Sequence, residues 1–132
     1  MISRIAALVD AFANLNAALD PKSDAYRLRN PLMLRAFHHK HDRDEKGYRI
    51  FKSFTSGYDI GVLDLRIKCS GKSFSKLTPQ NTLKDLVCVY GNPPTATRYV
   101  KNFLRIALND ETISESQELA WFLGDENTEV KE

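Results

Sequence analysis

Two kinds of sequence pattern meet at the stretch Gly47-Tyr48-Arg49-Ile50-Phe51-Lys52-Ser53-Phe54-Thr55-Ser56-Gly57. Tyr48 and Ile50 alternate with charged residues and lead to Phe51, which is the pattern of a short strand that runs into a turn. Gly57 opens a longer apolar segment, and the patterns that follow it are helical. We interpret this stretch as the junction between a small β lobe and a helical lobe, and ligand clefts form preferentially at such junctions.

The length and composition indicate one soluble globular domain. A chain of 132 residues buries about two-thirds of the surface that it exposes when unfolded. We assign residues 1–123 to the domain and residues 124–132 to an acidic, disordered tail. No apolar run reaches the roughly 20 residues that cross a bilayer. The apolar residues of 2–19 lack a basic leader, so they predict a folded helix rather than a signal peptide, in a protein made in the cytoplasm.

The charge is unevenly distributed along the chain. Residues 22–52 hold nine lysines and arginines against four acids, a net charge of +5, whereas residues 124–132 hold four acids and one lysine, a net charge of −3. A basic segment can bind an anionic polymer such as nucleic acid or a cell-wall glycan. The alternative is a solvated basic face that has no partner.

Helical periodicity accounts for most of the remaining chain. Residues 2–19 fit an amphipathic helix with Ser3 as its cap, which Asp20-Pro21 ends. Residues 58–69 nearly alternate, but their length favours a helix that ends at Ser70-Gly71. Three further helices are predicted to begin at Asn81, at Thr95 and at a capping box formed by Ser114 and Gln117. Cys69 and Cys88 both lie in apolar patterns, so we expect free buried thiols.

A histidine-rich run, His38-His39-Lys40-His41-Asp42-Arg43-Asp44-Glu45, contains several residue types that bind metals. Zinc sites draw their ligands from a rigid frame at set spacings, and this run has no such spacing. We therefore interpret it as a solvated turn between two strands. No phosphate loop, nucleophile elbow or paired-cysteine motif occurs, so no metal or cofactor is predicted.

An ordered series of short motifs resembles a family. It comprises Arg29-Asn30-Pro31 with Leu34-Arg35, Gly47-Tyr48-Arg49-Ile50-Phe51, Gly57-Tyr58, Thr82-Leu83-Lys84-Asp85-Leu86, and Tyr90 through Pro93-Pro94 to Tyr99-Val100. In order and spacing the series resembles the lysozyme-like domain of phage and bacterial proteins, which is related in fold to lytic transglycosylases and occurs in virion structural proteins. The resemblance covers about residues 25 to 115.

The resemblance implies an α+β, lysozyme-like fold, mostly helical, with a small β hairpin around residues 32–54. It also implies a peptidoglycan groove lined by Arg29, Asn30, Tyr48, Tyr90 and Tyr99. The sequence departs from the family at two places. Met33 and its neighbours replace the Gly-Asn of the signature, and the window from Phe12 to Asn16, where the catalytic glutamate is expected, contains no acid.

The leading hypothesis is therefore a catalytically degenerate lysozyme-like domain that acts as a structural or binding protein and associates with a virion. Its partners would be peptidoglycan or other virion subunits. A second hypothesis is an active muramidase or lytic transglycosylase that uses Asp20 or Glu45 as its acid. A third is a basic module that binds nucleic acid or a protein partner through residues 22–52.

Overall fold

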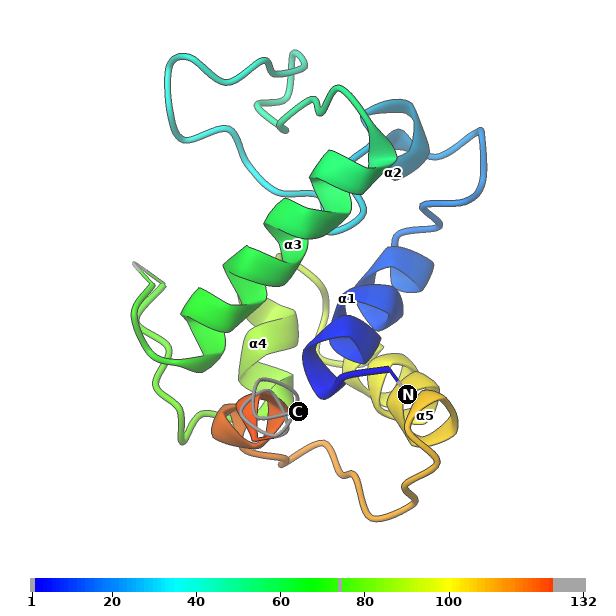
Figure 1. Ribbon diagram of the computed structural model, residues 1–132, viewed down its shortest axis with the longest axis vertical. Coiled ribbons are helices and arrows are strands. Elements are labelled where there is room, and N and C mark those ends of the chain that lie inside the picture. Colours follow the sequence, from blue (N-terminus) through cyan, green and yellow to red (C-terminus); the bar gives the residue numbers. More distant parts are fainter. Residues whose placement is uncertain (1, 74, 125–132) are drawn as a thin grey trace, which may run out of the picture.

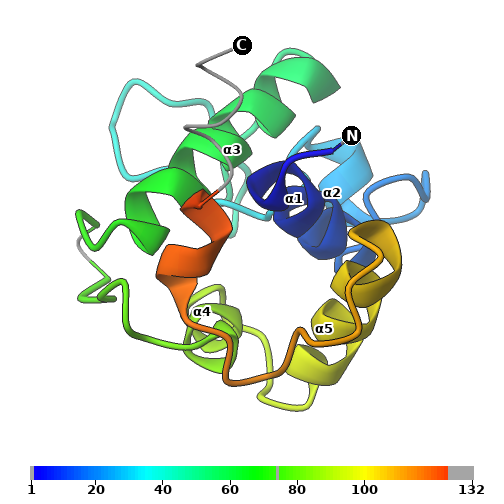
Figure 2. The same ribbon diagram turned by 60° about the horizontal axis from the view of Figure 1, so that its bottom comes forward.

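The computed structural model describes residues 2–73 and 75–124, and these form a helical domain. Its elements are α1 (Arg4–Leu15), α2 (Asp24–Arg27), α3 (Phe54–Cys69), α4 (Leu83–Val89), α5 (Ala96–Ala107) and the 3-10 helix η1 (Leu119–Leu123). α1 contacts α3 on one side and α5 on the other, and η1 contacts both α1 and α3 (Figures 1 and 2). The first helix is thus the centre about which the other elements pack.

α1 forms as its sequence predicts. The Ser3 hydroxyl accepts a hydrogen bond from the Ala6 amide at 3.1 Å, which satisfies one of the free N–H groups at the start of the helix. The helix ends at Leu15, four residues before the predicted end, because Ala17 turns the chain with a positive φ of 54°. The fully buried side chains of the core come from α1, α3, α4, α5, η1 and the loops, and the largest are Ile5, Leu8, Phe12, Leu32, Leu65, Leu83, Leu86, Leu104, Ile113, Leu119 and Phe122.

The predicted β hairpin does not form, so the prediction of an α+β fold with a hairpin over residues 32–54 is wrong. The described residues contain no β sheet, and their pairing in this region is limited to isolated antiparallel bridges, Arg35 with Tyr48 and Arg43 with Arg49. Two strands need an apolar face that packs against something else, and charged residues take up much of this segment. Phe37, which could have supplied such a face, is 91% exposed. Residues 28–53 instead form a long loop beyond the start of α3 (Figure 1).

α3 confirms the helix predicted over residues 58–69 and begins four residues earlier. The Ser53 hydroxyl caps it by accepting the Ser56 amide at 3.0 Å. Gly57 lies in its first turns, where a Cβ atom would be only 2.0 Å from the Arg29 carbonyl oxygen. The glycine therefore lets the helix approach the backbone of the preceding loop, which is the junction that the sequence stretch 47–57 indicates.

The C-terminal helices begin at slightly different residues from those predicted. α4 is capped by Thr82 rather than Asn81: the Thr82 hydroxyl accepts the Asp85 amide, and the Asp85 carboxylate accepts the Thr82 amide, which completes a capping box. Thr95 holds the predicted cap position of α5 without a side-chain hydrogen bond. The capping box predicted at Ser114 and Gln117 is wrong: these residues form a backbone turn, and the last element is a 3-10 helix.

The two cysteines differ in their exposure to solvent. Cys69 is buried and outside any disulfide, as predicted, whereas Cys88 is also outside any disulfide but exposed. The predicted acidic tail, apart from Gly124, lies outside the described residues. None of the helices in the described ranges is long and apolar enough to cross a membrane.

Candidate functional site

A groove lies between the C-terminal half of α1 and the start of α3. Its volume is about 350 Å³, at the small end of the range of roughly 300–1,000 Å³ that ligand pockets occupy. The lining combines two carboxylates, one carboxamide and two aromatic rings with small apolar residues: Asp10, Ala13, Asn14, Ala17, Ala18, Leu19, Asp20, Phe54 and Tyr58. The groove is therefore both polar and aromatic.

The wall from α3 is held to α1 by the Tyr58 hydroxyl. This hydroxyl donates to the Ala6 carbonyl oxygen at 3.3 Å and lies near the Asp10 carboxylate. Burial, followed by the negative charge of Asp10, raises the pKa of Tyr58 well above its ordinary value. Tyr58 therefore remains a neutral donor, and Asp10 is half-buried at the groove wall.

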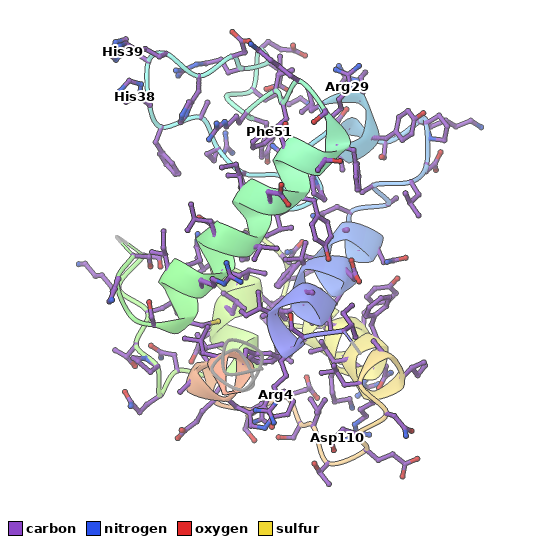
Figure 3. The ribbon with its side chains drawn as sticks, viewed as in Figure 1. Arg4, Arg29, His38, His39, Phe51 and Asp110 are labelled. Atoms are coloured by element: carbon purple, nitrogen blue, oxygen red, sulfur yellow. The ribbon has the colours of Figure 1, made fainter. Side chains whose placement is uncertain are left out.

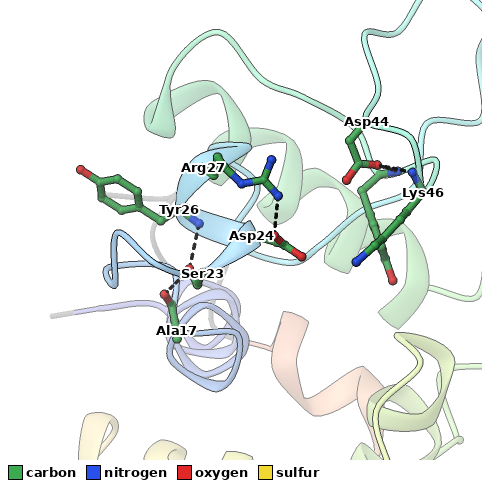
Figure 4. A network of polar contacts seen from close by, with 8 residues as sticks. Ala17, Ser23, Asp24, Tyr26, Arg27, Asp44 and Lys46 are labelled. Carbon is green, nitrogen blue, oxygen red and sulfur yellow. Dashed lines mark hydrogen bonds and ion pairs between the residues drawn. The ribbon is translucent and has the colours of Figure 1, made fainter.

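The far rim is the turn that joins α1 to α2, and hydrogen bonds fix its shape. The Ser23 hydroxyl donates to the Ala17 carbonyl oxygen at 2.7 Å and accepts the Tyr26 amide at 3.1 Å (Figure 4). The Asp20 carboxylate accepts the Lys22 amide at 3.0 Å. Because both ends of the turn are bonded, Asp20 is presented to the groove on a defined backbone.

The groove can accept hydrogen bonds, but it is poorly arranged for acid catalysis. Glycosidic cleavage needs a carboxylic acid that an apolar pocket keeps protonated beside the scissile bond. Asp20 is exposed and Asp10 is only half-buried, so neither carboxyl is enclosed by an apolar pocket. Glu45, the other acid considered for catalysis, is exposed on the long loop and does not line the groove.

Asn30 and its neighbours, predicted to line a glycan groove, have a structural role. Asn30 is 0% exposed, and its carboxamide bonds the backbone of Leu34 and Arg49 through three contacts of 2.9 Å. Arg29 is exposed with a φ of 54°, and Met33 has the same φ, so both residues adopt a backbone conformation that favours glycine.

The predicted tyrosines are dispersed over the domain. Tyr48 lies on the long loop beneath the Arg35 guanidinium, 4.3 Å from carbon Cζ to the ring centre. Tyr99 is exposed on α5, and Tyr90 follows α4. None of the five residues predicted to bind a ligand lines the groove between α1 and α3.

Tyr90 belongs to a polar cluster inside the domain. Its hydroxyl donates to the Asp64 carboxylate at 2.5 Å, and the Lys68 ammonium lies 2.5 Å from the same carboxylate. The Phe12 ring is 4.9 Å away, centre to centre. Burial, then the neighbouring Asp64 charge, raises the pKa of Tyr90. This cluster ties α3 to the end of α4 and engages the Tyr90 hydroxyl in a structural hydrogen bond.

The histidine-rich run lies at the outer edge of the long loop. His38 and His39 stack with ring centres 4.5 Å apart and point away from the helices (Figure 3). Across residues 2–73 and 75–124, no group of three or more histidine, cysteine, aspartate or glutamate side chains is placed to hold a metal. The run is a solvated loop, although it does not join two strands as predicted.

Comparison with protein-family models, with characterised proteins and with solved structures gives no match. The functional assignment therefore depends on the residues of the groove. Sequence reasoning found Asp20 but missed Asn14, Phe54 and Tyr58. The available signal was the spacing of Asp10 and Asn14, four residues apart on α1, which places two polar side chains on one helix face.

Proposed function

We propose that the protein is a non-catalytic binding domain for a glycan, with the groove between α1 and α3 as its binding site. The observation that carries the proposal is the placement of Asp10, Asn14 and Asp20 opposite the rings of Phe54 and Tyr58. Carboxylates and a carboxamide hydrogen-bond sugar hydroxyls, and aromatic rings pack against the C–H faces of sugar rings. The volume of the groove suits one or two sugar rings rather than a long polymer.

Exposed apolar side chains line the groove, and a bound ligand would cover them. Phe54 is 37% exposed and Leu19 is 77% exposed, and both line the groove. Covering such side chains gains about 25 cal/mol for each Å² of apolar surface removed from water. The motif series that resembles lysozyme-like domains supports peptidoglycan as the glycan and a virion-associated structural role. The absence of an acid from the window Phe12 to Asn16 supports binding without cleavage.

Isothermal titration with chitotriose and with soluble peptidoglycan fragments tests this proposal. We expect a dissociation constant on the order of 0.1–1 mM, or about −5.5 to −4 kcal/mol, for a small groove of this kind. Asn14→Ala removes one groove-lining carboxamide and should weaken binding by about tenfold, as the loss of one well-placed hydrogen bond does. Asn102→Ala, an exposed asparagine on α5, is the matched control and should change nothing.

A clearing assay with cell-wall suspensions distinguishes binding from catalysis. The proposal predicts no clearing beyond buffer while binding persists. Clearing that Asp20→Asn abolishes would show an active glycosidase instead. Absence of any glycan binding, with the fold intact by circular dichroism, would contradict the proposal.

A further inference from the structure

A second hollow lies in the long loop, next to the start of α3. Its volume is about 250 Å³, and its lining is Lys40, His41, Asp42, Arg49, Ile50, Phe51, Lys52 and Ser56. Three permanent cations and one histidine face a single carboxylate there. The volume falls below the roughly 300 Å³ at which pockets for drug-sized ligands begin, so the hollow suits a small ion or one charged group.

The backbone that carries these cations is fixed. The Ile50 amide donates to the Asp42 carbonyl oxygen at 2.8 Å, and Arg43 pairs with Arg49 in an antiparallel bridge. The Arg49 guanidinium packs over the Phe51 ring, 4.5 Å from carbon Cζ to the ring centre. Arg49 is thus held by its backbone and by its side chain, so positive charge is concentrated on a rigid surface rather than on free side chains.

His41 shows that this surface is electrostatically unbalanced. Its Nδ1 atom is buried and finds no hydrogen-bond partner among the described residues. Burial, then the positive charges of Arg49, His38 and Arg43, lowers the pKa of His41. A buried polar atom without a partner costs about 1–3 kcal/mol, and an anion in the hollow would neutralise the cations that surround His41.

The start of α3 adds to the positive potential. The amides of the first helical turn have no acceptors within the helix and carry the positive end of the helix dipole. Ser53 caps only one of them, the Ser56 amide, and Ser56 lines the hollow. A helix of 16 residues therefore directs its positive end towards the same side as the cationic side chains.

We propose that this hollow is a binding site for a tetrahedral oxyanion, of the kind carried by inorganic phosphate or a small phosphate monoester. Arg49 and Lys52 supply charged donors, and His41 supplies an imidazole that takes up a proton as the anion binds. Asp42 is the single opposing charge in the lining. The small volume favours one phosphate group over a stretch of nucleic acid. The proposed ligand of the basic segment 22–52 is therefore a small anion rather than an anionic polymer.

Nuclear magnetic resonance titration of the intact chain with sulfate tests the proposal, because sulfate keeps its double charge while histidine titrates. Sodium chloride at equal ionic strength is the reference. We expect saturable shifts of the His41 ring signals with a dissociation constant on the order of 1 mM, and a rise in the pKa of His41 as sulfate saturates the site. By linkage, sulfate should bind more tightly as pH falls through that pKa.

Variants locate the site. Lys52→Gln, which changes an exposed side chain, should weaken sulfate binding about tenfold, the effect of one lost charge-assisted hydrogen bond. Arg49→Gln should do the same or more. Lys84→Gln, at an exposed position on α4 outside the hollow, is the matched control and should leave the affinity unchanged.

Parallel titrations with inorganic phosphate and glucose 6-phosphate distinguish a free anion from a carried phosphate group: tighter binding of the ester indicates a carried group. The proposal is overturned if sulfate and phosphate cause no saturable shift at His41, or if Lys52→Gln and Lys84→Gln weaken binding equally. It is also overturned if a single-stranded oligonucleotide binds with a steep salt dependence while sulfate has no effect.

Discussion

Replacing Asn30 with alanine removes three hydrogen bonds from the buried turn that holds the long loop to the helices. The Asn30 carboxamide donates to the carbonyl oxygens of Leu34 and Arg49 and accepts the Leu34 amide, each at 2.9 Å. Asn30 has no exposed surface. The substitution leaves three backbone groups without their side-chain partner and opens a small cavity.

The size of the effect follows from these contacts. Each buried polar group left without a partner costs about 1–3 kcal/mol, and the loop can relax enough for water to reach some of them. We therefore expect Asn30→Ala to lower the free energy of unfolding by about 3 kcal/mol, a large part of the roughly 5–15 kcal/mol that stabilises a domain.

Urea unfolding followed by circular dichroism measures this change. Asn102→Ala, exposed on α5, is the control and should stay within about 0.5 kcal/mol of the native protein. Asn30→Asp places a carboxylate against two carbonyl oxygens, so the folded state raises the pKa of the new acid. This variant should be least stable at neutral pH and should regain stability as pH falls and the carboxyl is protonated. A loss below about 1 kcal/mol for Asn30→Ala would refute a structural role for this residue.

Three further predictions concern the packing of α3 and the start of α4. Gly57→Ala should cost about 3 kcal/mol in urea unfolding because its Cβ would meet a backbone oxygen at 2.0 Å. Gly61→Ala meets only the end of the Leu32 side chain, at 3.0 Å, and should cost clearly less; equal effects would contradict the close approach. Tyr90→Phe should cost about 1–3 kcal/mol through the lost hydrogen bond to Asp64 and leave glycan affinity unchanged, while a selective loss of binding would place Tyr90 in the site. Hydrogen bonds from the Thr82 amide and Asn81 lower the pKa of Asp85, so its contribution to stability is present above pH 3.8 and is lost as pH falls from 3.8 through the lower folded value. Asp85→Asn should therefore unfold less steeply over that acidic range, and an unchanged acid titration would contradict this.

The helices could be predicted from the sequence because local signals determine them. The apolar period of residues 2–19, the Ser3 cap and the length of the segment 58–69 depend on neighbours within a few residues. The hairpin could not be predicted correctly in the same way. Alternation over Tyr48 to Phe51 is compatible with a strand, but a strand forms only if a partner and a packing surface exist, and these depend on distant residues.

Less of the candidate site than of the helices could be predicted from the sequence. Asn30 and Tyr90 are polar residues of the kind that binds ligands, but the tertiary structure uses both to satisfy buried groups. The groove residues Asn14 and Tyr58 lie on two helices that are separated by the long loop. Only the packing of α1 against α3 brings these two residues together, and no local sequence pattern predicts that packing.

The most direct test of glycan binding without cleavage is a nuclear magnetic resonance titration with chitotriose in which the reaction products are analysed at the end. The Asn14 side-chain amide and the Tyr58 ring signals should shift together and saturate, while signals from Tyr48 and Tyr99 stay in place. The chitotriose should be recovered intact. Shifts centred on Tyr48 or Tyr99, no saturable shift at all, or recovery of shorter sugars would contradict the account.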